Sequence, residues 1–149
     1  MTAEAHWHGY GPWTGSHTLT ERSNDHLRRP GPEPNDPATA AFLQNTIPPL
    51  ENGHYLLRRA QTARDRTWTD VNDAMNWLCE TYQRHPPDPE VQYGDPEQRL
   101  FTTREGLVGG SDAIWHYTTS YSGDRIVVFA VICCPHRHKI NMPCPLPPR

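Results

Sequence analysis

The clearest periodic pattern of apolar residues in the chain lies between positions 68 and 82. Its members recur at intervals of three or four positions, and they are Trp68, Val71, Met75, Leu78 and Tyr82. This spacing places all five side chains on one face of a helix. Thr67 or Thr69 can cap the helix at its start, and His85 followed by Pro86 ends it. Because burying one aliphatic side chain contributes about 1.5 to 3 kcal/mol, this face requires a surface to pack against.

Weaker helical patterns precede this stretch. Asp36 can accept a free amide hydrogen at a helix start and Pro37 suits the first helical position, so a short helix is expected here, ending before Pro48. Residues 50–66 place aliphatic and small side chains on one side and most of their arginines elsewhere, which indicates a further helix.

Alternation of period two appears in the last third of the chain. From Ala113 to Tyr121, small and aromatic residues alternate with mixed ones, which is typical of a strand. Residues 126–134 are apolar on both faces, as expected for a central strand that is covered on two sides. Leu100–Thr103 has the length of a short third strand, whereas the proline-rich and acidic residues 85–98 predict a loop. The pattern therefore predicts an α+β fold, in which two or three N-terminal helices pack on a small C-terminal antiparallel sheet, a meander of about three strands.

The length and the proline content predict one domain with extended ends. The chain has 149 residues, of which 16 are proline, so it has room for one domain of ordinary size and much loop. Residues 1–35 are rich in aromatic residues, histidine and proline and show no regular period, so we interpret them as an extended arm. Residues 36–138 are predicted to form the single α+β domain. Residues 139–149 contain repeated prolines and are expected to form an extended C-terminal tail.

Charge and hydropathy exclude several classes of protein. The formal net charge of -3 and the pI near 6.3 give no basic surface of the kind that binds phosphate, so a nucleic-acid partner is not expected. The longest apolar run, residues 126–134, is far shorter than the roughly 20 residues that span a bilayer, so no membrane span is expected. Residues 1–30 contain no cationic start followed by an apolar core, so we expect no secretory signal and predict a cytoplasmic location.

Cysteine and histidine gather after the apolar strand. Thiolate sulfur and imidazole nitrogen are the ligands that zinc prefers, so Cys134, His136, His138 and Cys144 are predicted as a structural zinc site. Adjacent cysteines on a strand point to opposite faces, so only one of Cys133 and Cys134 can easily join such a site. Two other interpretations stay open. The cysteines could be small buried hydrophobic residues beside solvated histidines, or they could pair in a disulfide.

The string Cys133-Cys134-Pro135-His136, followed by Met142, resembles the copper-binding loop of cupredoxins. In that family a strand delivers a thiolate, and the next turn supplies a histidine and a distant thioether. The resemblance covers only the end of the chain. It implies a blue-copper site in a fold that is nearly all β, with an upstream histidine as the second imidazole.

The predicted architecture resembles the small toxins of the RelE and ParE type, which are directed at ribosomes or gyrase. The likeness lies in helices that are followed by an antiparallel meander ending in a basic, histidine-containing turn. The resemblance implies an enzyme whose cations and acid–base pair come from Arg125, His136, Arg137 and His138. A thiol such as Cys134 beside these histidines could also act covalently. The candidate catalytic residues are therefore His136, His138, Arg125 and Cys134.

Three aromatic residues, Trp7, Tyr10 and Trp13, lie among glycines and a proline near the start of the chain. Rigid rings give a large contact area at little rotamer cost, so this segment is predicted to dock on a partner, to fold back over its own sheet, or to stay disordered. His6 and His8 beside them could bind a metal ion adventitiously. The sequence thus predicts a small intracellular protein that acts by binding a protein partner or by self-association, in an accessory or regulatory role. The alternative is a small enzyme, of the toxin type or metal-dependent.

Overall fold

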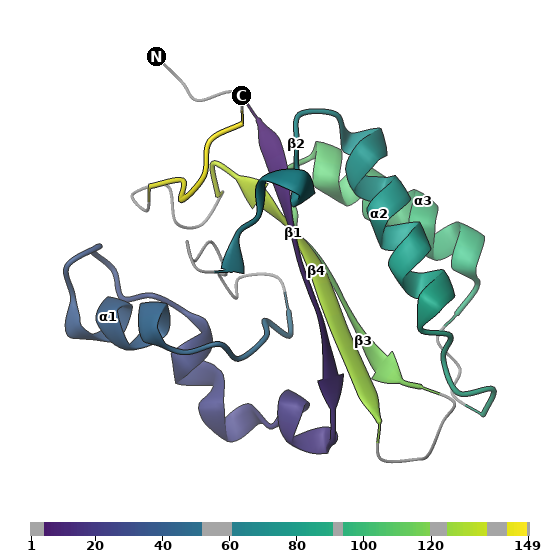
Figure 1. Cartoon of the computed structure of the whole chain (residues 1–149), viewed down its shortest axis with the longest axis horizontal. Helices are drawn as coiled ribbons and strands as arrows, with labels where there is room; N and C mark the ends of the chain where they lie inside the picture. Colours follow the sequence, from purple (N-terminus) through teal and green to yellow (C-terminus); the bar gives the residue numbers. More distant parts are fainter. Residues whose placement is uncertain (1–4, 52–60, 91–93, 120–124, 137–142, 149) are drawn as a thin grey trace.

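The centre of the protein is a β-sheet, seen in a computed structural model that describes residues 5–51, 61–90, 94–119, 125–136 and 143–148 (Figure 1). The strands among these residues are β1 (His6–Gly15), β2 (Thr67–Trp68), β3 (Ala113–Thr118) and β4 (Ile126–Cys134). They form one four-stranded sheet in the order β2-β1-β4-β3, and each neighbouring pair is antiparallel. The two longest strands, β1 and β4, therefore lie at the centre of the sheet.

The pairing of β1 with β4 contains one irregularity. It begins with His6 opposite Cys134, and its register shifts between Tyr10 and Trp13. Gly11 lies in this stretch with a φ of 93°, a left-handed conformation that glycine adopts without steric cost. Because of the shift, Tyr10 and Trp13 both pack on the same side of the sheet.

Helices α2 (Val71–Arg84) and α3 (Pro96–Val108) cover one face of the sheet (Figure 1). Helix α2 packs against β1 and β4, and α3 packs against α2 and β3. The buried core between the helices and the sheet includes Ala74, Leu78, Leu107, Trp115, Tyr117, Val127, Phe129, Val131 and Cys133. In the part of the chain that the structure describes, no helix has the length and apolarity needed to cross a membrane.

The other face of the sheet is covered by α1 (Pro37–Gln44) and by short 3-10 helices. These are η1 (His17–Thr20) and η2 (Arg22–Arg28), while a further short one, η4 (Arg64–Arg66), precedes β2. The core on this face contains Tyr10, Phe42, Ala130, Ile132 and Cys134, with Cys144 of the C-terminal segment packed against it. Because the sheet lies between two layers, β4 is buried on both faces.

Several local predictions from the sequence are confirmed. Helix α1 begins directly after Asp36 with Pro37 in its first turn, and α2 ends at Arg84, just before His85. The Asp36 side chain, however, accepts the Glu33 N–H and not an amide hydrogen of the helix. Four of the five apolar side chains predicted for one helix face lie on α2 and pack against the core, namely Val71, Met75, Leu78 and Tyr82. The helical prediction is wrong for the fifth, Trp68, which packs against the same core from β2. The buried positions of β3 alternate, and β4 is the central, doubly covered strand that its apolar run predicts.

The predicted order of elements is wrong. The sheet begins with an N-terminal strand and the helices follow it, whereas the sequence pattern predicts helices first, a sheet last and an extended N-terminal arm. Residues 6–15 lie in the middle of the sheet instead. Their strand gives no apolar alternation because its buried positions include His6, His8 and Gly9, and because a glycine and a proline interrupt it.

Two helical predictions also need correction. Helix α3 occupies residues for which the pattern predicts a short strand at Leu100–Thr103, because its apolar residues are too sparse to form a clear stripe. Its start carries the same sequence signal as α1, an aspartate followed by proline, and here the Asp95 side chain accepts the Glu97 N–H. The cap of α2 is Asp70 rather than Thr67 or Thr69. The predicted helix over 50–66 falls largely on residues 52–60, which lie outside the described residues.

Gly9 lies where β1 passes close to two indole rings. A Cβ atom at this position would lie 2.6 Å from Cη2 of Trp68, far inside van der Waals contact. The Trp68 ring in turn packs on Trp77, with ring centroids 5.7 Å apart, so it cannot move alone. We expect Gly9→Ala to lower the free energy of unfolding by about 1 to 3 kcal/mol, the usual cost of overpacking, as measured by urea denaturation.

Gly106→Ala is the matched control for this prediction. Gly106 lies inside α3, and a Cβ atom there would meet Ser111 Cβ at an ordinary 3.7 Å. Alanine is favoured over glycine inside a helix by about 1 kcal/mol, so this variant should be at least as stable as the wild type. Wild-type stability in Gly9→Ala would contradict the packing argument.

Candidate metal centre

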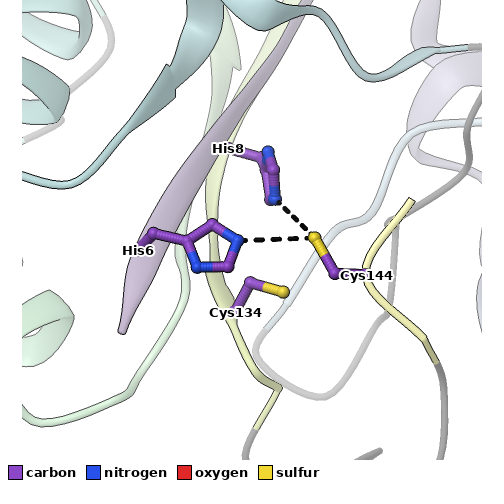
Figure 2. Close-up of side chains that lie close together, drawn as sticks. All are labelled: His6, His8, Cys134 and Cys144. Atoms are coloured by element: carbon purple, nitrogen blue, oxygen red, sulfur yellow. Dashed lines mark hydrogen bonds between the residues drawn. The ribbon is translucent and has the colours of Figure 1, made fainter. Parts of the chain in front are cut away.

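Two histidines and two cysteines meet at the end of the sheet where β1 begins and β4 ends. They are His6, His8, Cys134 and Cys144, and their ligand atoms all lie within 4.8 Å of one another (Figure 2). His6 is directly opposite Cys134 in the β1–β4 pair, and His8 lies two positions along β1, so the three side chains share one face. Cys144 reaches the group from the C-terminal segment. The group could hold a metal ion.

Two of the distances within the group are close to those of tetrahedral coordination. Sγ of Cys144 lies 3.4 Å from Nε2 of His6 and 3.5 Å from Nε2 of His8. Zinc bonds of about 2.3 Å to sulfur and about 2.05 Å to nitrogen place tetrahedral neighbours about 3.6 Å apart. Figure 2 shows both rings turned toward the Cys144 sulfur, with the Cys134 sulfur beside them. With the Cys134 sulfur inside the same 4.8 Å limit, the four side chains could surround one ion.

A chain of hydrogen bonds determines which nitrogen of His8 faces the group. Oγ1 of Thr67 donates to the backbone carbonyl of Ala63 at 2.8 Å, so this oxygen accepts a hydrogen bond from Nδ1 of His8 at 2.9 Å. The proton of neutral His8 is therefore on Nδ1, and Nε2 presents its lone pair toward Cys144. Metal-binding histidines are typically oriented by a second hydrogen bond of this kind.

Burial governs the charge of the group. His8 is 0% exposed, His6 3% and Cys134 4%, whereas Cys144 is half-buried. Burial, together with the proximity of His6, lowers the pKa of His8 to about 4, so His8 is neutral at neutral pH, as a metal ligand must be. Burial, followed by the neighbouring Cys144 thiol, raises the pKa of Cys134 well above its usual range. Coordination to a metal ion is what would convert such a thiol to a thiolate.

Comparison with known proteins gives no match. No protein-family model, curated protein or solved structure matches the chain. The function is therefore inferred from the geometry and chemistry of the chain itself.

The structure brings together two of the four zinc ligands predicted from the sequence, Cys134 and Cys144. His136 belongs to a separate pair, in which its Nε2 lies 2.7 Å from Oδ2 of Asp112 and both side chains are almost fully buried. His138 lies outside the described residues. The imidazoles that approach the two cysteines come from His6 and His8 instead.

The candidate catalytic residues lie apart. Arg125 directly precedes β4 and Cys134 ends it, so at about 3.3 Å per residue the two are roughly 30 Å from each other. His136 is buried beside Asp112. In the loop that resembles cupredoxins, the histidine is His136, which is paired with Asp112, and Met142 lies outside the described residues.

The three aromatic residues near the start of the chain pack within the chain itself. Tyr10 is 1% exposed, and its hydroxyl lies 2.6 Å from Oγ1 of Thr62. The indole N–H of Trp7 donates to the Leu107 carbonyl at 3.2 Å, and that of Trp13 donates to a carbonyl at 3.0 Å. These rings therefore serve the fold in the described structure.

The sequence contains one signal for the two histidines of the group. His6 and His8 are two positions apart, which puts both side chains on one face of a strand. This spacing becomes informative only once residues 6–15 are known to form a strand that pairs with the end of β4.

Proposed function

We propose that this protein binds one zinc ion through His6, His8, Cys134 and Cys144, and that the ion has a structural role. The observation that carries the proposal is the convergence of four ligand atoms within 4.8 Å, three of them on buried side chains. Imidazole nitrogen and thiolate sulfur in equal number form a set that zinc prefers. Magnesium and calcium, in contrast, prefer oxygen ligands.

The ligand set favours a structural role over a catalytic one. Catalytic zinc sites keep one coordination position for water or substrate, whereas structural sites are closed by four protein ligands. Here four protein side chains would fill the tetrahedral shell, and three of them are no more than 4% exposed. A substrate would have little access to an ion in this position.

The proposed ion would connect distant parts of the chain. His6 belongs to β1, Cys134 to β4 and Cys144 to the C-terminal segment, and the contact between His6 and Cys144 joins residues 138 positions apart. Because such a site does not exist in the unfolded chain, the free energy of metal binding adds to the stability of the folded state. The role that we propose is to hold the C-terminal segment against the sheet.

Metal analysis of the reduced protein tests this proposal. We expect native mass spectrometry of the untagged chain, purified without chelator and supplied with zinc, to give one zinc ion per chain. Cys134→Ala should lose most of this zinc, because it removes a buried thiolate that faces both histidines.

Cys133→Ala is the matched control. Cys133 is adjacent in sequence and equally buried, but it points to the opposite face, where its Sγ lies 3.4 Å from the Ser111 carbonyl. This variant should keep its zinc. A wild-type chain that takes up no zinc, or equal zinc contents in the two variants, would count against the proposal.

The structure offers less support for the other functions predicted from the sequence. The protein-binding role stays a prediction. The three aromatic residues on which it rests are engaged within the chain, since Tyr10 is buried and the indoles of Trp7 and Trp13 are hydrogen-bonded there. We do not propose the enzyme, because Arg125 and Cys134 lie at opposite ends of β4.

A further inference from the structure

The two cysteines of the proposed centre differ in exposure and lie close enough to react with each other. Cys134 is 4% exposed at the end of β4, whereas Cys144 is half-buried in the C-terminal segment. Their sulfur atoms are within 4.8 Å. A disulfide bond is about 2.05 Å long, so the sulfurs need to approach by less than about 2.8 Å. Rotation of the Cys144 side chain, which lies outside the sheet, can supply much of this approach.

We infer that Cys134 and Cys144 form a redox-sensitive pair, which a hydroperoxide oxidises to a disulfide with release of zinc. The inference rests on the proposed zinc centre and adds its regulation. A sulfur atom in a disulfide no longer carries the thiolate charge that zinc binds. Once both sulfurs are withdrawn, only the imidazoles of His6 and His8 remain from the group of four. Zinc binding and the disulfide therefore exclude each other.

The reaction balances with hydrogen peroxide as the oxidant. The thiolate of Cys144 attacks one peroxide oxygen, the O–O bond breaks, and Cys144 becomes a sulfenic acid while hydroxide leaves. The thiolate of Cys134 then attacks the Cys144 sulfur, the S–O bond breaks and the S–S bond forms with loss of a second hydroxide. Two protons from solvent convert the hydroxides to water. The two sulfurs together lose two electrons, the peroxide gains them, and zinc leaves as the unchanged divalent ion.

The remaining cysteines of the chain are placed differently. Cys133 faces the opposite side of β4, where its Sγ lies 3.4 Å and 3.8 Å from two backbone carbonyls. Cys79 is half-buried on α2, in the layer that covers that same side. Neither residue belongs to the group of four ligand atoms. The pair of Cys134 and Cys144 is therefore the one that oxidation is expected to join.

Zinc release and disulfide mapping, followed together, test the inference. The reduced, zinc-loaded chain is treated with excess hydrogen peroxide in the presence of a chromogenic chelator. Trypsin then separates the two cysteines, because Arg137 and Lys139 lie between them, and fragmentation of the linked peptides distinguishes Cys134 from Cys133. We expect the loss of one zinc ion for each Cys134–Cys144 link, with recovery after dithiothreitol and zinc. Cys79→Ser, the control, should behave as the wild type does.

The outcomes separate this inference from the proposed function. Zinc that stays bound in peroxide, or that leaves while the cysteines form sulfinic acid or a link through Cys79 or Cys133, overturns the inference and leaves the zinc centre in place. A reduced chain that takes up no zinc before peroxide is added defeats the proposed function, and the inference falls with it.

Discussion

Removal of the metal ion is expected to lower the melting temperature of the protein by about 10 °C. Zinc at a free concentration a thousand times its dissociation constant stabilises the folded state by about 4 kcal/mol. Each kcal/mol corresponds to roughly 2 to 4 °C for a chain of this size. The effect is large because the ion would hold β1, β4 and the C-terminal segment together. Calorimetry of the reduced protein with and without a strong chelator measures the shift.

Variants of two half-buried cysteines, one a proposed ligand and one a matched control, make this experiment specific. Cys144→Ser removes a ligand, so the variant should begin at the lower melting temperature and should not respond to the chelator. Cys79→Ser changes a cysteine of similar exposure on α2, and it should respond as the wild type does. If the chelator leaves the wild-type melting temperature unchanged, the ion is not part of the fold.

Asp112→Ala is expected to lower the free energy of unfolding by about 3 to 5 kcal/mol. The side chain of Asp112 is 1% exposed, with one carboxylate oxygen 2.7 Å from Nε2 of His136 and the other accepting the Cys133 backbone N–H at 2.9 Å. Removing one member of a buried pair costs more than the contact itself, because the remaining polar groups stay buried. Urea denaturation of the metal-free protein measures this loss without any contribution from zinc.

Two further variants make this result specific. Asp112→Asn should lose less stability than Asp112→Ala, because its amide oxygen can still accept the Cys133 N–H. Asp65→Ala removes an exposed aspartate in η4 and should change stability by no more than about 0.5 kcal/mol. A loss below about 1 kcal/mol in Asp112→Ala would show that the buried pair contributes little.

The sequence predicts best the elements whose core positions are apolar. The core positions of residues 68–82 and 126–134 are apolar, so the local pattern predicts their burial. Strand β1 differs, because His6 and His8 occupy core positions in it. Their burial depends on thiols and a threonine hydroxyl from distant segments, and no local pattern contains that information.

The candidate site is predictable only in the part that is local in sequence. Cys134 and Cys144 lie near each other in the chain and also in space. His136 is nearer to Cys134 in sequence, yet it pairs with Asp112, which directly precedes β3. His6 takes its place because β1 pairs with β4 in a register that puts it opposite Cys134, and the strand order that brings them together is a property of the whole fold.

The position of His6 opposite Cys134 has a mechanical consequence. These residues form the last rung of the β1–β4 ladder at the end where β1 begins and β4 finishes. A force that pulls the two residues apart would open the ladder rung by rung from this end, instead of loading all of its hydrogen bonds at once. The proposed ion lies on the first rung to open. Separation of β1 from β4 at this end would then require the rupture of metal–ligand bonds.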